Sequence, residues 1–138
     1  VGPALKLSLP FEGSWPISEG GKAQDHINRG RSPALDFKTP LGTPVLAALV
    51  GYVTMAGWYS DWGKYVRLDH GYIEELNGYL QTGYAHLDRI YAVIGEYSVT
   101  GARIGDSGNT GDSTGPHLHF ELYLNGVRVD PAPYLGLA

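Results

Sequence analysis

The chain has 138 residues, no cysteine and a formal net charge of −4 at pH 7. This length fits one compact domain with a core of its own, and the lack of cysteine excludes disulfides and thiolate chemistry. Charges of both signs are mixed along the chain, so we expect no nucleic-acid-binding surface. No apolar run approaches the roughly 20 residues of a membrane span, so we expect no membrane-spanning segment.

Short segments bounded by turn residues dominate the chain, which contains 20 glycines, 9 prolines and 10 tyrosines. Gly and Pro separate the segments, and Tyr, Val and Thr fill them, which is typical of an all-β domain with many turns. No window keeps apolar residues at i, i+3, i+4 and i+7. We therefore expect no long helix and at most a short terminal turn over Pro131–Leu135.

The N-terminal residues 1–24 are predicted to be a leader or edge segment ahead of the main domain, residues 25–138. Within the leader, Leu5–Leu9 alternates between apolar and polar residues, and we expect an edge strand there before Pro10. The chain begins at Val1 and carries no signal peptide, so we expect a mature or trimmed fragment.

A loop and a short strand open the main domain. Residues 25–34 include Asn, Gly, Ser and Pro and predict a loop. Residues 35–37, Leu-Asp-Phe, alternate in character. As a strand they place the Asp36 carboxylate on one face and the two apolar side chains on the other.

Paired strands are expected through the middle of the chain. Residues 40–54 predict a turn, a strand and a bend at Gly51 into the next strand, and residues 99–105 repeat this pattern weakly. Residues 64–70 alternate well, and residues 79–86 are their expected partner.

The last predicted element is a hairpin over residues 120–129. Its turn is expected at Asn125-Gly126, because this pair tolerates the left-handed backbone of a two-residue hairpin loop.

The segment Ser113–Glu121 reads Ser-Thr-Gly-Pro-His-Leu-His-Phe-Glu and contains the most informative polar residues. On an extended segment, His117 and His119 point to one side of a sheet, while Leu118 and Phe120 point to the other. The two imidazoles can serve one metal site, one as a ligand and one as an outer group. The turn before them is rich in Gly, Ser and Thr, which indicates a defined backbone path.

The other histidines are His26, His70 and His86. Zinc prefers imidazole and carboxylate ligands, and a catalytic zinc site uses three protein ligands with one position left for water. Asp36 is a candidate ligand because it is a carboxylate on an otherwise apolar strand. The alternative for Asp36 is a solvated strand face.

Three segments, in order along the chain, resemble the lysostaphin-type zinc metallopeptidases of family M23. Residues 36–48 resemble the strand that enters the site of that family, residues 84–87 its second motif, and residues 105–121 its third. The resemblance runs from about His26 to Tyr134. It implies an all-β fold of antiparallel sheets, a lipoyl-like barrel-sandwich hybrid with little helix, and zinc as the cofactor.

The resemblance also implies roles for individual residues. Asp36 and His119 look like zinc ligands. His86 and His117 look like the catalytic histidines beside the metal.

The remaining zinc ligand should be a histidine upstream of the aspartate. In most of the family it lies four residues before the aspartate, where this chain has Ser32. His26 is the only upstream histidine, and we assign it as the third ligand, with residues 28–33 as an inserted loop.

Other residues have both a structural and a functional interpretation. We expect His70 to be a structural residue at a strand end near the site. Glu121 shares the face of the metal-binding histidine and is either an outer partner of the metal centre or a solvated strand residue. Trp58, Tyr59 and Trp62 either line a groove for an extended substrate or pack in the core.

The predicted function is zinc-dependent peptide hydrolysis. The resemblance implies an endopeptidase that cuts the stems or cross-links of peptidoglycan with a zinc-activated water, and hence a place outside the cytoplasm, in the periplasm, in the cell wall or secreted. The residues themselves indicate only a peptide substrate. No His-Glu-x-x-His helix is present, so the helical metalloprotease mechanism is excluded.

Two alternatives come from other classes of protein. Degenerate members of the family bind the cell wall or partner proteins without catalysis, but such domains usually lose ligands, whereas here only the usual first ligand is displaced. A lipoyl-like carrier would account for the Gly-bounded strand pairs. It would need a lysine at a tight hairpin tip, which is missing, and it does not explain the histidines.

Overall fold

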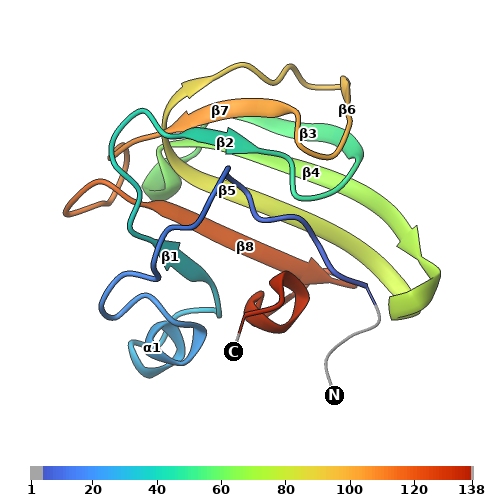
Figure 1. Cartoon of the computed structure of the whole chain (residues 1–138), viewed down its shortest axis with the longest axis horizontal. Coiled ribbons are helices and arrows are strands. Elements are labelled where there is room, and N and C mark those ends of the chain that lie inside the picture. Colours follow the sequence, from blue (N-terminus) through green and yellow to red (C-terminus); the bar gives the residue numbers. More distant parts are fainter. Residues whose placement is uncertain (1–4, 138) are drawn as a thin grey trace.

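The computed structural model describes residues 5–137 and consists mainly of antiparallel strands (Figure 1). The described part contains one α-helix, α1 (Ala23–Asn28), and three short 3-10 helices, η1 (Ser60–Trp62), η2 (Glu74–Leu76) and η3 (Ala132–Leu135). Its strands are β1 (Leu35–Phe37), β2 (Pro44–Leu46), β3 (Gly51–Trp58), β4 (Lys64–Ile73), β5 (Gly78–Ile90), β6 (Tyr97–Ser98), β7 (Arg103–Ser107), β8 (Leu118–Leu124) and β9 (Val127–Val129). The expected all-β fold with little helix is confirmed.

Strand β5 is the centre of the sheet. The strand order is β1-β8-β5-β4-β3-β6, while β7 pairs with both β2 and β5, and β9 pairs with β8. β5 pairs with β8 over Leu80–Ala85 and then changes partner, pairing with β7 from Leu87 to Ile90. The predicted pairing of the segments 64–70 and 79–86 is confirmed in the β4·β5 ladder.

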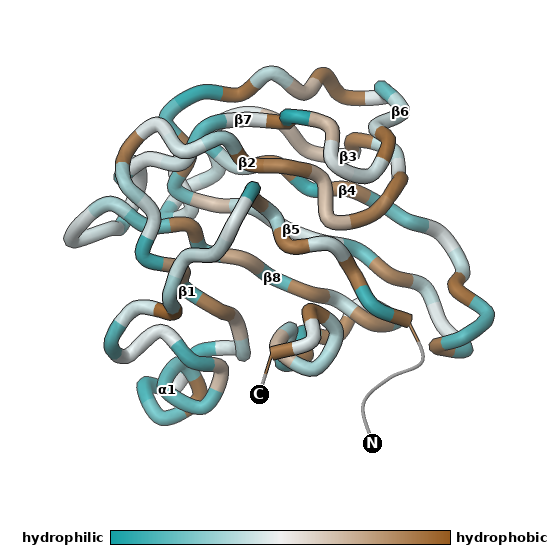
Figure 2. Tube along the Cα trace, viewed as in Figure 1, coloured by the Kyte–Doolittle hydropathy of each residue, from teal (hydrophilic) through white to brown (hydrophobic). Residues whose placement is uncertain are grey.

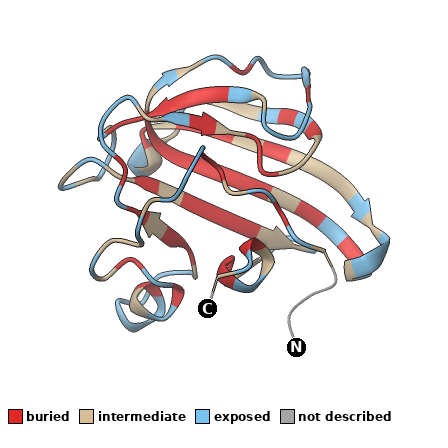
Figure 3. Ribbon diagram, viewed as in Figure 1, coloured by how far each residue is buried: buried red, intermediate tan, exposed pale blue. Residues whose placement is uncertain are grey.

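The core lies against β5 and β8, whose central parts are mostly buried (Figure 3). Leu118, Phe120 and Leu122 of β8 are fully buried, and the Tyr84 ring packs edge-on against Phe120 at a centroid distance of 5.4 Å. Hydrophobic residues recur along both strands (Figure 2). Because burying each large apolar side chain contributes about 1.5–3 kcal/mol, this alternation fixes the face on which His119 lies.

The described part of the leader packs on the core without forming the expected edge strand. Leu7 and Phe11 are buried, but no strand is assigned to Leu5–Leu9. The Leu7 amide donates to the Tyr134 carbonyl and the Ser8 amide to the Ala48 carbonyl. These carbonyls belong to two different segments, so no continuous ladder forms. The rest of the leader, residues 1–4, lies outside the described residues.

The prediction of a loop over residues 25–34 is wrong for its first part. Residues 25–28 belong to α1, and only the residues after Asn28 form a loop. The backbone N–H of Lys22 donates to the Asp25 carboxylate at 3.0 Å, which satisfies a free amide at the start of the helix. Six residues are too few to show a helical period in the sequence. No helix in residues 5–137 is both long and apolar enough to cross a membrane.

The hairpin between β8 and β9 is confirmed. Asn125 and Gly126 have φ values of 52° and 77°, the left-handed pair that a type I′ turn requires. The turn places β9, and with it Arg128, beside β8.

Candidate metal centre and cleft

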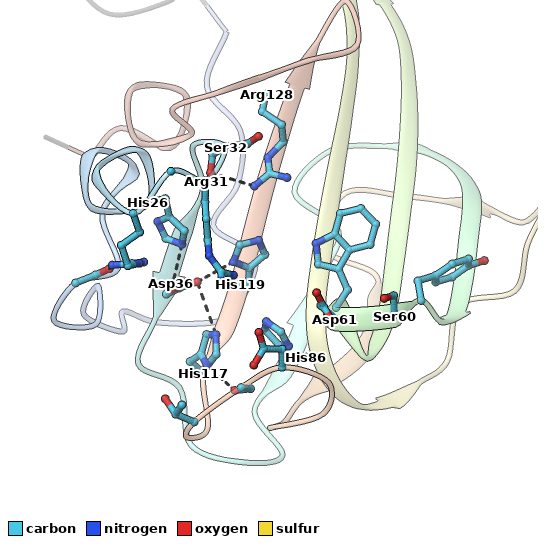
Figure 4. Close-up of a pocket in the computed structure, with 18 of the residues that line it drawn as sticks. His26, Arg31, Ser32, Asp36, Ser60, Asp61, His86, His117, His119 and Arg128 are labelled. Atoms are coloured by element: carbon cyan, nitrogen blue, oxygen red, sulfur yellow. Dashed lines mark hydrogen bonds and ion pairs between the residues drawn. The ribbon is translucent and has the colours of Figure 1, made fainter.

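A cleft of about 890 Å³ lies beside α1, β1 and β8 (Figure 4). One wall is formed by α1 and the loop that follows it. The opposite wall is formed by η1 and by the loop before β8. The histidines of α1, β5 and β8 and the carboxylate of β1 lie between these walls.

Three side chains from three elements meet in this cleft. His26 comes from α1, Asp36 from β1 and His119 from β8. His26 Nε2 lies 3.2 Å from Asp36 Oδ2, and His119 Nδ1 lies 2.9 Å from Asp36 Oδ1. The possible ligand atoms of the three residues all lie within 4.8 Å of one another. Two imidazoles and one carboxylate form the donor set of a catalytic zinc site with an open position, so these residues fit a zinc ion.

Hydrogen bonds within the fold orient the imidazole rings of His26 and His119. His26 Nδ1 donates to the Lys22 carbonyl at 2.9 Å, one helical turn earlier, which leaves Nε2 facing Asp36. His119 Nε2 is bonded to Glu121 Oε2 at 3.0 Å, which leaves Nδ1 facing Asp36. The antiparallel register of β1 and β8 puts Asp36 directly opposite His119.

The pKa values of this cluster reflect close pairing of opposite charges. Burial raises the pKa of Asp36, but the hydrogen bonds from His119 and His26 outweigh it and hold the pKa well below the ordinary carboxyl range. Burial lowers the pKa of His119, but its bonds to Asp36 and Glu121 raise it to about 9. Asp36 is therefore ionised at neutral pH.

Two more histidines face the same cleft. The rings of His86 and His117 lie 4.8 Å apart, and His117 Nε2 is 3.7 Å from Asp36 Oδ1. His86 Nδ1 donates to the Thr110 carbonyl at 2.7 Å, and His117 Nδ1 donates to the Gly115 carbonyl at 2.8 Å. Burial lowers the pKa of His86 to about 4, so this ring is neutral at pH 7. In the neutral form each ring keeps Nε2 as a proton acceptor.

The backbone of His86 is left-handed inside a strand, with φ of 61°. This conformation is uncommon for a residue with a side chain and costs on the order of 1–3 kcal/mol. It occurs where β5 stops pairing with β8 at Ala85 and starts pairing with β7 at Leu87. The change of partner coincides with the position from which His86 reaches the cleft.

Comparison with known proteins identifies the family of the chain. A sequence model for "Peptidase family M23" matches residues 30–131, which is most of the chain. The chain belongs to this family.

Two named proteins are similar to most of this chain in sequence. The M23 domain is 45% identical over 125 residues to the peptidoglycan DD-endopeptidase ShyA of Vibrio cholerae, a match covering 88% of this chain and 28% of that protein. It is 39% identical over 113 residues to lysostaphin of Staphylococcus simulans, covering 79% of this chain and 22% of that protein. The chain thus spans about a quarter of the length of these relatives.

Solved structures share the fold over nearly the whole chain. A zinc-containing peptidase from Vibrio cholerae superposes with a TM-score of 0.75 and 31% identity, covering 93% of this chain and 39% of that one. The catalytic domain of lysostaphin from Staphylococcus simulans gives a TM-score of 0.68 and 32% identity, covering 96% of this chain and 92% of that one.

The family match of the M23 domain begins at residue 30, so His26 lies outside it. The chain has Ser32 where most of the family is expected to supply the first ligand, and its carbonyl accepts a bond from Arg128 at 3.4 Å. Helix α1 brings His26 to Asp36 from the far end of the loop. The assignment of His26 as a ligand therefore rests on geometry.

His70 does not lie near the cleft. It lies beside a separate hollow next to β3 and β4, where Nδ1 donates to the Val50 carbonyl and Nε2 is bonded to Thr82 Oγ1, both at 2.8 Å. Both ring nitrogens are used within the fold. The structural interpretation of His70 fits these contacts, but its expected position near the site is wrong.

The interpretation of Glu121 as a solvated strand residue is also wrong, because its side chain is fully buried. Of the three aromatic residues, Tyr59 and Trp62 line the cleft, whereas Trp58 is 61% exposed and lies outside it. Trp62 also stacks on the buried Tyr65 ring at 4.2 Å, so it both packs and lines the cleft.

Several cleft residues gave no signal in the sequence. Arg31 lies on the wall formed by the loop after α1, and Arg128 reaches the cleft from β9 (Figure 4). Asp61 and Asp112 also line the cleft. The Asp112 amide donates to the Asp61 carbonyl, which ties η1 to the loop before β8. None of these residues belongs to a recognisable spacing, because each comes from a different loop or strand.

Proposed function

We propose that this M23 domain is a zinc-dependent endopeptidase. The observation that supports it most is the convergence of His26, Asp36 and His119, with their possible ligand atoms within 4.8 Å of one another. His86 and His117 flank this cluster with an acceptor nitrogen each. These five residues together provide a ligand set and two proton-transfer groups in one open cleft.

In the proposed reaction His26, Asp36 and His119 hold zinc, which when bound supplies a Lewis acid and lowers the pKa of a water molecule toward about 7. One of His86 and His117 accepts the proton of the attacking water at Nε2 and returns it to the leaving amine. Before it returns the proton, the protonated ring can also donate to the oxyanion that forms on the carbonyl. The backbone bonds at Nδ1 keep both rings oriented through these steps.

The proposed substrate is the peptide part of peptidoglycan. ShyA of Vibrio cholerae is named a peptidoglycan DD-endopeptidase, and the cleft volume of about 890 Å³ lies within the range of ligand-binding pockets. Such a substrate places the enzyme outside the cytoplasm.

The first experiment measures zinc content and hydrolysis together. Purified protein should contain one zinc per chain and release smaller peptides from peptidoglycan fragments, detected by mass spectrometry. A chelator should stop hydrolysis, and added zinc should restore it. A folded protein that binds no zinc and cleaves no fragment would support the non-catalytic binding module instead.

The pH profile gives a second test of the same proposal. Hydrolysis should decline between neutral pH and pH 4, because protonated histidines neither bind zinc nor accept a proton. Activity that is unchanged at pH 4 would contradict the proposed role of the histidines.

A further inference from the structure

A buried carboxylate behind the candidate metal centre has no part in the mechanism above. Glu121 lies on β8 two residues beyond His119, on the same face of the strand, and its side chain is fully buried. A buried carboxylate is stable only where its oxygens are paired and hydrogen-bonded. Its partners therefore indicate what it is for.

Both oxygens of Glu121 are fully used. Oε2 is bonded to His119 Nε2 at 3.0 Å and pairs with Arg128 Nη1 at 2.9 Å. Oε1 accepts from the hydroxyls of Tyr65 at 2.8 Å and Tyr123 at 3.0 Å. An ionised carboxylate only accepts hydrogen bonds, so Nε2 of His119 carries a proton toward Glu121. Nδ1 donates to Asp36 in the absence of metal, and it is the nitrogen that would give up its proton to bind zinc, while Glu121 keeps the proton on Nε2.

Arg128 connects this carboxylate to the loop between the first two proposed ligands. Besides its contact with Glu121, Arg128 donates from Nε to the Pro33 carbonyl at 2.9 Å and from Nη2 to the Ser32 carbonyl at 3.4 Å. These carbonyls lie in the loop that joins His26 to Asp36. The Arg128 guanidinium therefore contacts both Glu121, which is bonded to His119, and the loop between His26 and Asp36.

The sequence also leaves space for this arrangement at Gly83, on the neighbouring strand β5. A Cβ atom on Gly83 would lie 2.6 Å from Glu121 Oε1 and in collision with the Tyr65 hydroxyl. A side chain at this position would displace the Tyr65 hydroxyl, the carboxylate or both. The glycine, the two tyrosines and Arg128 together hold Glu121 in one position.

We propose that Glu121 is a positioning residue for the metal centre, and that its pair with Arg128 couples His119 to the loop that carries His26 and Asp36. The inference rests on the proposed zinc function. It adds that the long spacing between His26 and Asp36 works because Arg128 holds the loop from β9. Partners that orient a ligating histidine typically contribute 10–100-fold to metal affinity.

The test compares zinc affinity in Glu121→Gln with Tyr123→Phe, using competition against a chromophoric chelator. Glu121→Gln keeps the shape of the side chain and removes its charge, and zinc affinity should fall by about 10–100-fold. Tyr123→Phe removes one bond to Oε1 and leaves both contacts of Oε2, so zinc affinity should change by less than about threefold. Nitrogen-15 NMR of the zinc-bound wild type should show the proton of His119 on Nε2.

A second pair of variants tests the loop and does not depend on Glu121→Gln being folded. Arg128→Lys keeps the charge but cannot make the hydrogen bonds to both the Pro33 and Ser32 carbonyls. The backbone amides of Gly30 and Arg31 donate to the Ile27 and His26 carbonyls. Their hydrogen–deuterium exchange should therefore become several-fold faster in this variant. Arg67→Lys is the control, because Arg67 contacts Tyr65 and Tyr123 but not the loop.

The outcomes separate this inference from the proposed function. Unchanged zinc affinity in Glu121→Gln, equal losses in Glu121→Gln and Tyr123→Phe, or a His119 proton on Nδ1 would each overturn the inference. Unchanged exchange in Arg128→Lys would overturn the coupling to the loop. Wild-type protein that binds zinc but hydrolyses no peptide would overturn the proposed function and leave the affinity comparison decisive. Wild-type protein without zinc would overturn both.

Discussion

The cleft and the hollow beside β3 and β4 use histidine in opposite ways. In the cleft each of the four histidines has one nitrogen held by the fold, while the other faces Asp36 or the open cleft. In the hollow, both nitrogens of His70 are bonded to neutral partners within the fold. Histidine by itself therefore indicates neither role. The second nitrogen and what it faces make the difference.

The largest expected effect is that of His119→Ala, which removes the proposed ligand at the centre of the cluster. The variant should bind no zinc and retain no measurable hydrolysis, a loss of at least about 10³-fold. Metal analysis and the fragment assay check this. His70→Gln is the matched control from the hollow and should keep one zinc per chain. If His70→Gln lost zinc and His119→Ala kept it, the assignment of His119 as a ligand and of His70 as a structural residue would be wrong.

His26→Ala tests the proposed ligand that lies outside the family match. Removal of a direct ligand should lower zinc affinity by more than the 10–100-fold expected for an outer partner. Ser32→Ala, at the usual position of the first ligand, should leave zinc affinity unchanged. If Ser32→Ala loses zinc and His26→Ala keeps it, the assignment of His26 is wrong.

His117→Ala divides the histidines of the cleft into two classes. His117 Nε2 lies 3.7 Å from the nearest Asp36 oxygen, farther than either proposed imidazole ligand. Hydrolysis should fall by about 10²–10⁴-fold with zinc content largely kept, because only proton transfer is lost. Equal zinc loss in His117→Ala and His119→Ala would remove the distinction.

The smallest effect concerns stability and belongs to His70. Burial lowers the pKa of His70, although its bond to the Val50 carbonyl raises it. As pH falls below the unfolded value of about 6.5, the unfolded chain takes up a proton that the native state resists, so stability is lost toward acid. The slope from this group is at most about 1.4 kcal/mol per pH unit.

Denaturant unfolding at pH 7 and pH 5 checks the role of His70. His70→Gln should lose less stability than the wild type over this interval, even if it is less stable at both pH values. An equal loss in the two proteins would show that His70 does not contribute to the pH dependence.

Local pattern was enough to predict much of the sheet. The alternation around His119, the pairing of residues 64–70 with 79–86 and the Asn125-Gly126 turn are all confirmed. Each depends on neighbours in sequence, since side chains alternate along a strand and a type I′ turn needs two residues that tolerate positive φ. Helix α1 was missed because its six residues carry no periodic signal.

The partners within the cleft were not predictable from local pattern. Asp36 and His119 are 83 residues apart in sequence and are bonded because β1 pairs with β8. The left-handed backbone of His86 follows from a change of strand partner. The local pattern allows Glu121 to be either a solvated residue or a partner of the metal centre. Its pairing with Arg128 depends on the position of β9 beside β8.

The sequence by itself determined the family, the all-β class and the face of β8 on which His119 and Glu121 lie, because these follow from motif, composition and period-two alternation. Only the tertiary structure decided that His26 reaches Asp36, that both ring nitrogens of His70 are hydrogen-bonded within the fold, and that Glu121 is buried. Those outcomes depend on contacts between distant segments. Such contacts form because strands bury apolar faces together, and no local pattern specifies which polar groups then meet.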